Sequence, residues 1–322
     1  MSTSPASPSD AHPTGMVASV TEDVVSTVQA VRVIAKRHTH KSTSWWIGRV
    51  ALYALLVVAS VAMLIPFFWM VISSFKRDNE VFSVPVRWLP LTWHPENYIR
   101  IFSNSMAGGY SMTNWLKNTL ILAVVVTFLQ VLTGSFAAYG FARVKFPGRN
   151  ALFLGYVATI AVPWQAYMIP QFILLTKVGL SNTLWAIILL QAFGAFGVFL
   201  MKQFYETIPE ELSESARIDG LSEYGIYWRI MLPLSVPAIA SLSLLTFVNT
   251  WNDFLGPLLY LRDRNLFTIQ LGLNTFAGDP QTASQDALIM TGAVISVLPI
   301  AIIFMLGQRY FVEGIATSGM KG

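Results

Sequence analysis

The sequence predicts an all-α integral membrane protein with six transmembrane helices, and three observations support this fold class. Hydrophobic residues make up 54% of the 322-residue chain and charged residues only 12%, which leaves too few polar groups to cover a soluble surface of this size. Six apolar segments each reach the ~20 residues that a helix needs to cross a bilayer. None of them shows the alternation of polar and apolar residues that strands of a membrane β-barrel require.

The chain begins with a polar segment, residues 1–44, that is rich in Ser, Thr and Pro. We expect a disordered cytoplasmic tail there, in which Val24 to Lys36 could form a short interfacial helix. A signal peptide is not expected, because the first apolar run starts late and lacks a small-residue cleavage site. At the other end, residues 311–322 are too short for a domain and are expected to form a cytoplasmic C-terminal tail.

Apolar segments alternate with polar loops along residues 45–310, which we expect to form one six-helix domain. Prolines inside several segments remove backbone donors and should kink or break the helices. Small residues at Gly134 and Ala138, and from Ala192 to Gly197, should let neighbouring helices approach closely. The expected spans are Ile47–Phe75, Trp115–Ala142, Ala151–Thr176, Thr183–Phe204, Ser235–Tyr260 and Ala287–Tyr310.

The distribution of Lys and Arg predicts the orientation. Six spans place both termini, and the loops after spans two and four, on one side of the membrane. That side carries 13 of the 21 Lys and Arg, and Arg143, Lys145 and Arg149 share one very short loop. The positive-inside rule therefore makes it the cytoplasmic side. The net charge of +4 then reflects topology, and no basic stripe interleaved with aromatics indicates nucleic-acid binding.

Polar residues inside spans three and five suggest a translocation path. Asn249 lies near the middle of span five, and Asp253 is expected one helical turn further outward on the same face. A carboxylate at this depth is costly, so it must face a hydrogen-bond partner or an aqueous cavity. A structural role and a pathway role both remain open. The candidate path residues are Gln165, Tyr167, Asn249, Trp251, Asn252 and Asp253.

Several classes of chemistry have no support in the sequence. The chain has no Cys, which excludes disulfides, thiol nucleophiles and zinc–thiolate sites. No phosphate-binding loop of the form G-x-x-x-x-G-K-[ST] is present, and no catalytic constellation or two-metal carboxylate cluster is apparent. We therefore expect a non-catalytic subunit that binds no metal or cofactor itself. If transport is energised by ATP, then ATP and Mg²⁺ must bind to another polypeptide.

A polar, acid-rich segment, residues 206–233, lies between spans four and five. Its first half contains good helix formers after Pro209, and Gly220 stands where a helix would end. A second helix can begin after Ser222, a residue type that is preferred at helix N-caps. Ala216 and Gly220 lie four residues apart and would present a close-packing face to a partner outside the bilayer. An ordinary amphipathic connecting loop is the alternative interpretation.

The spacing of this segment resembles the EAA loop of ABC importer permeases, with Ser215 where the motif usually has Ala. The matching pattern is Glu214-Ser215-Ala216, then Gly220, Ile230 and Leu232-Pro233. The tail Gln308–Val312 and Lys321-Gly322 resembles the ending of MalG-like permease subunits of maltose-type importers, although Glu313 stands where those relatives often have Arg. Pro147-Gly148-Arg149 and Asn249–Asp253 add to the likeness, which covers Ile47 to Gly322.

The resemblance implies a type I ABC importer permease in a bacterial cytoplasmic membrane, embedded in lipid with both termini cytoplasmic. It implies four kinds of partner: a second homologous (MalF-like) permease, two ATPase subunits, an extracytoplasmic substrate-binding (lipo)protein and a carbohydrate substrate. The implied ATPase-coupling residues are Glu214, Ser215, Ala216, Arg217, Asp219, Gly220, Ile230, Leu232 and Pro233. The implied tail contacts to the ATPase are Gln308, Tyr310, Phe311, Lys321 and Gly322.

In this family the outer loops meet the binding protein, and here they run from Lys76 to Asn114 and from Asp263 to Asp286. Residues Gly272–Gln281 match the loop that reaches toward the ligand cleft, but by position only. From another class, a self-contained secondary transporter or channel would use Asp253 as its ion site. A membrane enzyme is the third hypothesis, and the absence of a catalytic constellation counts against it.

Overall fold

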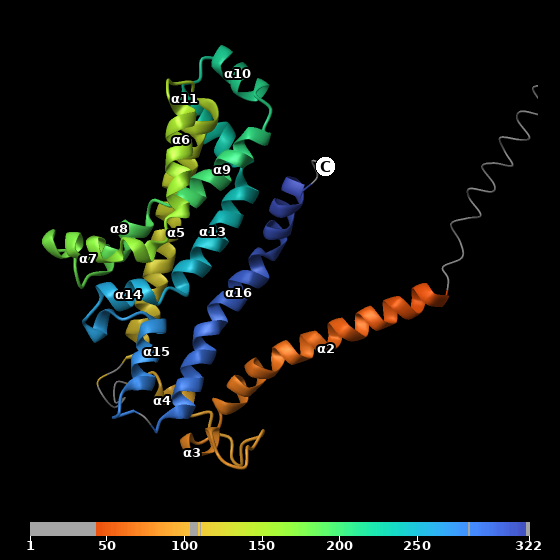
Figure 1. Cartoon of the computed structure of the whole chain (residues 1–322), viewed down its shortest axis with the longest axis vertical. Helices are drawn as coiled ribbons and strands as arrows, with labels where there is room; N and C mark the ends of the chain where they lie inside the picture. Colours follow the sequence, from red (N-terminus) through yellow and green to blue (C-terminus); the bar gives the residue numbers. More distant parts are fainter. Residues whose placement is uncertain (1–42, 104–108, 110, 283, 320–322) are drawn as a thin grey trace, which may run out of the picture. The chain divides into compact units, whose positions relative to one another are not determined.

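A computed structural model of the chain describes residues 43–103, 109, 111–282 and 284–319 (Figure 1). Every regular element in these residues is a helix, which confirms the predicted all-α class. The chain separates into two units, Met1–Pro66 and Phe67–Gly322. The expected N-terminal tail and its interfacial helix lie outside the described residues.

Helix α2 (Thr43–Ser73) corresponds to the first expected span and contains Pro66. Between Trp45 and Ser73, an 18-residue window has a mean hydropathy of 2.6, which is enough for a membrane helix. Near its start the guanidinium carbon of Arg49 lies 4.1 Å from the ring centroid of Trp45. A cation over an indole ring is typical of the membrane–water boundary, where both groups can stay partly hydrated.

Four helices form the centre of the second unit: α5 (Met112–Arg143), α9 (Ala195–Thr207), α13 (Val236–Trp251) and α16 (Asp286–Gly319). Helix α5 packs against α9 and α13, and α13 also packs against α16. The contact between α5 and α9 is close: a Cβ on Gly134 would lie 3.4 Å from the carbonyl carbon of Gly197. The small residues thus allow near backbone contact, as expected.

The expected count of six spans is not confirmed. Within the described residues four helices are long and apolar enough to cross a membrane, or five if one bent pair counts as a span. The expected span Ala151–Thr176 is broken, as its internal prolines predicted. It divides into α6 (Arg149–Ala158), η2 (Thr159–Ala161), η3 (Trp164–Ala166) and α7 (Met168–Lys177). The break falls at Pro163, and the preceding Val162 is extended (φ −85°, ψ 112°), as residues before proline usually are.

The fourth and fifth spans are also interrupted. Helix α8 (Leu184–Gln191) and α9 are separated at residues 192–194, which include Gly194. The bent pair consists of the helical stretches Glu223–Leu234 and Val236–Trp251, which meet at 77° near Ser235. The expected fifth span continues to Tyr260, but α13 ends at Trp251 and a separate helix, α14 (Leu255–Tyr260), follows. Helix α16, in contrast, continues through Pro299 to Gly319.

Short elements cover the two ends of α5. Near its start lie α3 (Asp78–Val81), α4 (Asn97–Arg100), η5 (Arg264–Leu266) and α15 (Ile269–Gly278); we call this the outer end. The part of Gly272–Gln281 up to Gly278 is helical, and a Cβ on Gly272 would overlap the Trp115 ring of α5. At the opposite end in Figure 1 lie α10 (Glu211–Ile218), α11 (Glu223–Ile226), the π-helix η4 (Tyr227–Met231) and α12 (Leu232–Leu234).

Candidate coupling segment and translocation cavity

Helix α10 forms and ends where the sequence predicts. Glu211 and Glu214 occupy its first turn and Arg217 its last, an arrangement that complements the helix dipole. Gly220 has φ 84°, its N–H donates to the Arg217 carbonyl (3.0 Å), and the Leu221 N–H donates to the Ala216 carbonyl (3.0 Å). These two bonds define a Schellman ending, which requires a left-handed residue at this position. Ser222 caps α11 by accepting from the Gly225 N–H (3.3 Å).

One face of α10 is seated on the chain's own core. Ser213 and Ala216 are buried, and Ala216 belongs to a hydrophobic cluster with Tyr205, Tyr227 and Met231. The expectation that Ala216 and Gly220 share an outward face is therefore wrong for Ala216. Its small side chain lets α10 approach the membrane helices of the same subunit. The partly buried Ile230 and Leu232 pack against the same cluster.

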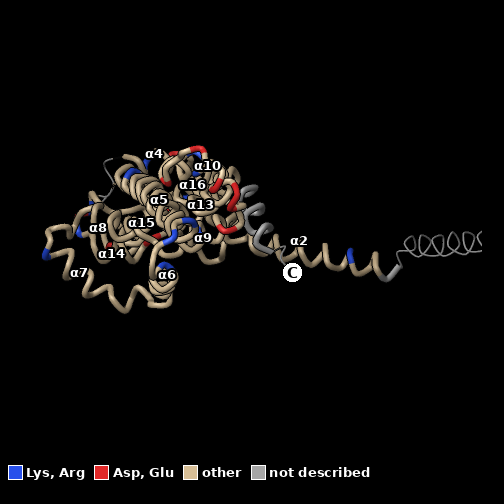
Figure 2. The backbone as a smooth tube through the Cα atoms, turned by 90° about the horizontal axis from the view of Figure 1, so that it is seen from above, with Lys and Arg blue, Asp and Glu red and all other residues tan. Residues whose placement is uncertain are grey.

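The opposite face of α10 is exposed and carries both charge and apolar area. Leu212, Glu214 and Ile218 of α10 are exposed, Ile218 to 87%, as are Asp219 at its C-cap and Tyr224 of α11. We call these five residues the coupling surface. Figure 2 shows acidic residues gathered at α10, whereas most of the other residues that it colours carry no charge. An exposed apolar group beside carboxylates is typical of a surface that a partner covers. Ser215, Arg217 and Pro233 are exposed as well.

A chain of three side chains connects α10 to α5. The Arg217 Nε donates to Glu223 Oε1 (2.8 Å), and the Tyr139 hydroxyl of α5 donates to Glu223 Oε2 (2.6 Å); we call this chain the strut. The bond to Glu223 raises the pKa of the Arg217 guanidinium above its ordinary value, because a nearby carboxylate favours the charged form. Charge-assisted bonds of this kind are stronger than neutral ones.

Arg143 holds the end of α5 against the end of α9. Its Nη2 donates to the Tyr205 carbonyl (2.6 Å) and also to the Ile208 carbonyl, and its side chain is buried. Carbonyls at a helix C-terminus lack intrahelical partners and carry partial negative charge. Arg143 satisfies two of them where the chain leaves α9 for α10. Arg143, one of the basic residues that predict the membrane orientation, thus also has a structural role.

A cavity of about 630 Å³ opens where the helices are broken. Residues of α5, the η3–α7 segment, the α8–α9 break and the α13–α14 break contribute to its wall. Irregular backbone at membrane depth is tolerated where it lines such a cavity. The lining residues are Val126, Gln130, Trp164, Tyr167, Gln171, Ile187, Leu190, Gln191, Phe193, Gly194, Thr246, Asn249, Thr250, Asn252, Asp253, Phe254, Leu255, Gly256 and Tyr260.

Four of the six candidate path residues line this cavity: Tyr167, Asn249, Asn252 and Asp253. Asp253 does not continue the helical face of Asn249, because α13 ends at Trp251. It sits in the break, where Oδ1 accepts from the Gly256 N–H (3.1 Å) and Oδ2 accepts from Gln191 Nε2 (2.7 Å). The carboxylate therefore both organises the break and faces the cavity, which joins the two roles that the sequence left open.

The other two candidates do not line the cavity. Trp251 is buried, its Nε1 donates to the Ser296 carbonyl (3.0 Å), and its ring stacks on Phe247. It therefore ties α13 to α16, a structural role. Gln165 is exposed outside the lining.

Glutamines are the cavity residues that the candidate set omitted. Gln130 Oε1 accepts from the Thr246 hydroxyl (2.6 Å), and Gln191 Oε1 accepts from Thr250 (3.1 Å). Gln171 Oε1 accepts from Trp164 Nε1 (2.9 Å) and from the Tyr260 hydroxyl (2.8 Å). These glutamines could have been found from the sequence, because an amide inside an apolar segment is costly to bury without a hydrogen-bond partner.

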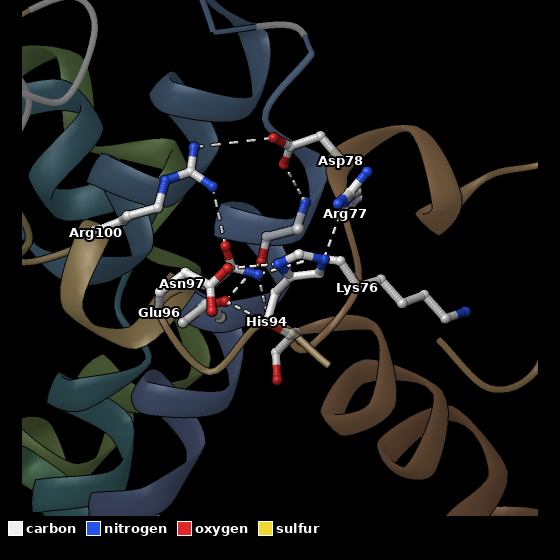
Figure 3. Close-up of polar contacts among 10 residues, drawn as sticks. Lys76, Arg77, Asp78, His94, Glu96, Asn97 and Arg100 are labelled. Carbon is white, nitrogen blue, oxygen red and sulfur yellow. Dashed lines mark hydrogen bonds and ion pairs between the residues drawn. The ribbon is translucent and has the colours of Figure 1, made fainter. Parts of the chain in front are cut away.

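At the outer end, polar side chains bind the chain to itself (Figure 3). Asn97 is buried, and its Nδ2 donates to the carbonyls of Ser74 (2.9 Å) and Lys76 (3.0 Å). Arg100 Nη1 donates to Asn97 Oδ1 (3.0 Å) and Arg100 Nη2 lies 4.0 Å from Asp78 Oδ2. Asp78 Oδ1 accepts from the Ala287 N–H at the start of α16 (3.0 Å). We call Asp78, Asn97 and Arg100 the clasp.

Neighbouring charges extend the clasp. The imidazole of His94 accepts from Arg77 Nε (3.0 Å) and contacts Glu96 Oε1 through Nδ1 (2.5 Å). The Lys76 side chain points away from this group in Figure 3. Its Nζ donates to the Arg87 carbonyl (2.7 Å) and lies 3.8 Å from the Trp69 ring centroid. Burial lowers the pKa of Lys76, since desolvation disfavours the charged form.

The predicted tail contacts are described only in part. Gln308, Tyr310 and Phe311 belong to the backbone of α16, but their side chains lie outside the described structure. Lys321 and Gly322 lie outside the described residues altogether. Their contact with a partner stays a prediction.

Comparison with known proteins identifies relatives over most of the chain. The family described as "Binding-protein-dependent transport system inner membrane component" matches residues 130–317. The arabinooligosaccharides transport system permease protein AraQ of Halalkalibacterium halodurans is 35% identical over 289 residues, which cover 89% of this chain and 100% of AraQ. The probable ABC transporter permease protein YurM of Bacillus subtilis is 33% identical, covering 86% of this chain and 90% of YurM.

The fold also matches a solved structure. A chain in the crystal structure of a bacterial ABC transporter involved in the import of the acidic polysaccharide alginate superposes with a TM-score of 0.76. The sequence identity is 23%, and the match covers 84% of this chain and 99% of that one. The overall arrangement of the helices therefore matches a known fold.

Proposed function

This chain belongs to the family of inner membrane components of binding-protein-dependent transport systems, and on that premise we propose that it is the permease subunit of an importer driven by a separate ATPase. The observation that carries the proposal is the position of α10. One face of this helix is seated on the subunit's core, and the other exposes Glu214, Ile218 and Asp219. Such a helix can be gripped from outside while its movement reaches the membrane helices.

The contacts of α10 suggest how force would be transmitted. ATP-driven movement of the ATPase would displace α10, and the strut would carry this displacement to α5 through Glu223 and Tyr139. Arg143 would make the end of α9 move together with α5. The 77° bend near Ser235 would transmit the movement to α13. Helices α5 and α13 line the cavity, so their movement would change access to it. This is alternating access between two packings, biased by the nucleotide state of a partner.

The proposed cargo is a carbohydrate. AraQ is named for arabinooligosaccharides, and the solved structure with the same fold belongs to an alginate importer. The cavity combines aromatic rings with amide and hydroxyl groups, which suits a polyhydroxylated ligand. We propose that a second homologous permease completes the path. An extracytoplasmic binding protein would deliver the substrate, and two ATPase subunits would bind ATP and Mg²⁺ on the cytoplasmic side, where both termini lie.

A secondary transporter that uses Asp253 as an ion site is the second candidate. Asp253 faces the cavity, but both of its carboxylate oxygens already accept hydrogen bonds from the chain. Replacing it with Asn keeps the shape and removes the charge. Uptake that survives in Asp253→Asn but stops without ATP supports the ATP-driven importer. Uptake that needs Asp253 and a proton gradient, and not ATP, supports the secondary transporter.

The decisive experiment compares two coupling variants and one control variant in the reconstituted complex of permeases, ATPase and binding protein. Glu214→Arg reverses a charge on the coupling surface, and Gly220→Trp adds bulk beside it. Gly148→Trp is the matched control for the second variant, because Gly148 has a similar φ of 78°, and a Cβ at either glycine would meet no atom within 4 Å. ATP-dependent sugar uptake and ATPase activity are both measured in proteoliposomes.

We expect Glu214→Arg and Gly220→Trp to reduce uptake to background while the subunit still inserts and folds. Gly148→Trp should retain most of the uptake, because it imposes the same backbone strain outside the coupling segment. Normal uptake in both coupling variants would contradict the proposal.

A further inference from the structure

The cavity wall carries few charged residues, and their sign bears on whether neutral or acidic sugars can bind. Among the described residues that line it, none is Lys, Arg or His, and Asp253 carries the single formal charge. Asp253 is held by Gln191 Nε2 and the Gly256 N–H, and no cation lies within ion-pair distance of it among the described ion pairs. The wall is thus neutral to negative.

The amides of the wall have donors to spare. Trp164 Nε1 can only donate, so the Gln171 atom that it contacts must be the oxygen, and the Gln171 NH₂ group is turned away from that bond. Gln130 likewise uses its oxygen to accept from Thr246. Asn249 is exposed to the cavity, and neither end of its amide is hydrogen-bonded in the described part of the chain. Neutral N–H and C=O groups suit hydroxyl groups, which both donate and accept.

Aromatic rings complete the neutral wall. Trp164, Tyr167, Phe193 and Tyr260 contribute to the lining, and their faces can pack against the C–H faces of a sugar ring. We propose that this cavity accepts neutral saccharides and rejects those with a carboxylate, such as uronic acids. The inference rests on the proposed import of carbohydrates and specifies the substrate class.

The rejection follows from desolvation. A carboxylate that enters the cavity leaves water and finds no cation to pair with on the described wall of this subunit, which is strongly unfavourable. If Asp253 is ionised, repulsion between like charges in a medium of low dielectric adds to this cost. If Asp253 is protonated, the missing cation still prevents compensation. In either protonation state of Asp253, the cavity therefore discriminates against acidic sugars, because the sugar carboxylate is left unpaired.

The test measures ligand affinity without the binding protein, so that this protein's own selectivity does not enter. Saturation-transfer NMR on the purified permease–ATPase complex is carried out with α-1,4-linked galactobiose, maltose and arabinobiose, and with digalacturonate. Galactobiose and digalacturonate differ only in the oxidation of C6, which makes them a matched pair. We expect at least one neutral disaccharide to bind, and digalacturonate to bind at least about tenfold more weakly than galactobiose.

A charge-introducing variant makes the test specific to this cavity. Asn249→Lys places a cation on the wall and should raise the affinity for digalacturonate relative to galactobiose by about tenfold. Gln165→Lys is the matched control, because it makes the same exchange of an amide for an ammonium outside the lining, and it should leave the ratio unchanged.

Three results would overturn the inference: equal or tighter binding of digalacturonate by the unmodified complex, no binding of any neutral disaccharide, or an equal shift in both Lys variants. The proposed function is judged separately, by ATP-dependent uptake in the presence of the binding protein. An importer that proves to carry acidic sugars would therefore refute the inference alone.

Discussion

The two ends of α5 use their polar residues in opposite ways. At the outer end, Asp78, Asn97 and Arg100 all bond to each other or to the chain's own backbone. At the other end, Glu214 and Asp219 are exposed, with no hydrogen bond to other described side chains. The outer end is thus closed on itself, whereas the coupling end keeps charges available for a partner.

This difference indicates that the outer end is held in place and that the coupling end can move. The clasp joins residues 209 positions apart and holds α3 and α4 against α16. The strut instead joins α10 to α5 through two partly exposed side chains, Arg217 and Glu223, and the buried Tyr139. A subunit that is pushed from outside needs one end to yield and the other to hold. Substitutions at the coupling end should therefore affect transport, and those at the outer end should affect stability.

The largest effect is expected at the buried side of α10. Ala216→Leu forces three extra carbons into a site that is 5% exposed, and overpacking of this kind costs about 1–3 kcal/mol. Helix α10 should shift, and ATP-dependent uptake in proteoliposomes should fall to background. Ala216→Ser is the near-isosteric control and should retain uptake. Full activity of Ala216→Leu would show that the seating of α10 is not required.

The strut is expected to have the next largest effect. Glu223→Gln removes the charge that binds Arg217 and Tyr139, and bonds to charged groups contribute about 1.5–3 kcal/mol. Sugar transported per ATP hydrolysed should fall by about tenfold, while the ATPase still binds. Tyr139→Phe should act in the same direction.

Tyr156→Phe serves as the control for the loss of a hydroxyl group, because the Tyr156 hydroxyl makes no described hydrogen bond, and it should transport normally. If both strut variants kept the normal ratio of transport to hydrolysis, the strut would be a packing feature and not a transmission element.

Between the two ends, adding one methyl group at Gly194 should weaken the binding of sugar in the cavity. A Cβ on Gly194 would overlap the amide nitrogen of Gln130, so Gly194→Ala should displace this amide and break its bond to Thr246. The loss of one hydrogen bond, about 0.5–1.5 kcal/mol, predicts a two- to tenfold weaker sugar affinity. Gly155→Ala is the control, since a Cβ there meets no atom within 4 Å. Unchanged affinity in Gly194→Ala would exclude Gln130 from the binding wall.

The smallest effect on transport is expected at the clasp. Asp78→Ala removes the acceptor for the Ala287 N–H, and loss of a helix-capping side chain costs about 0.5–2 kcal/mol. The melting temperature of the purified subunit should fall while uptake changes by less than about twofold. Asp78→Asn keeps an acceptor oxygen and should restore much of the stability. A strong loss of transport without loss of stability would erase the contrast between the two ends.

Local signals in the sequence predicted the coupling segment well. Gly220 ends α10 and Ser222 caps α11 because each acts on its immediate neighbours. The break at Pro163 was predictable, because a proline inside an apolar segment removes a backbone donor. The break at residues 252–254 was not predicted. The break at Asp253 depends on Gln191, which is distant in the sequence.

Contacts between distant segments were beyond the sequence patterns altogether. Nothing in the sequence around Asp78 indicates that it caps Ala287, and Trp251 seemed a path residue until its bond to Ser296 placed it in the core. Periodicity locates apolar segments, but it does not report which side chains meet across the bundle. The cavity glutamines were omitted although an amide inside an apolar segment is a signal in itself; only their partners on other helices lay beyond the sequence patterns.

The bond between Asp78 and the start of α16 has a consequence for biogenesis. Ribosomes synthesise chains from the N-terminus, so the Asp78 carboxylate emerges long before the amide that it will cap. Until α16 is inserted, the segment between α2 and α5 lacks one of its anchors. Completion of the polypeptide is thus the event that seals the outer end, and nascent chains halted before Ala287 should present this loop to proteases.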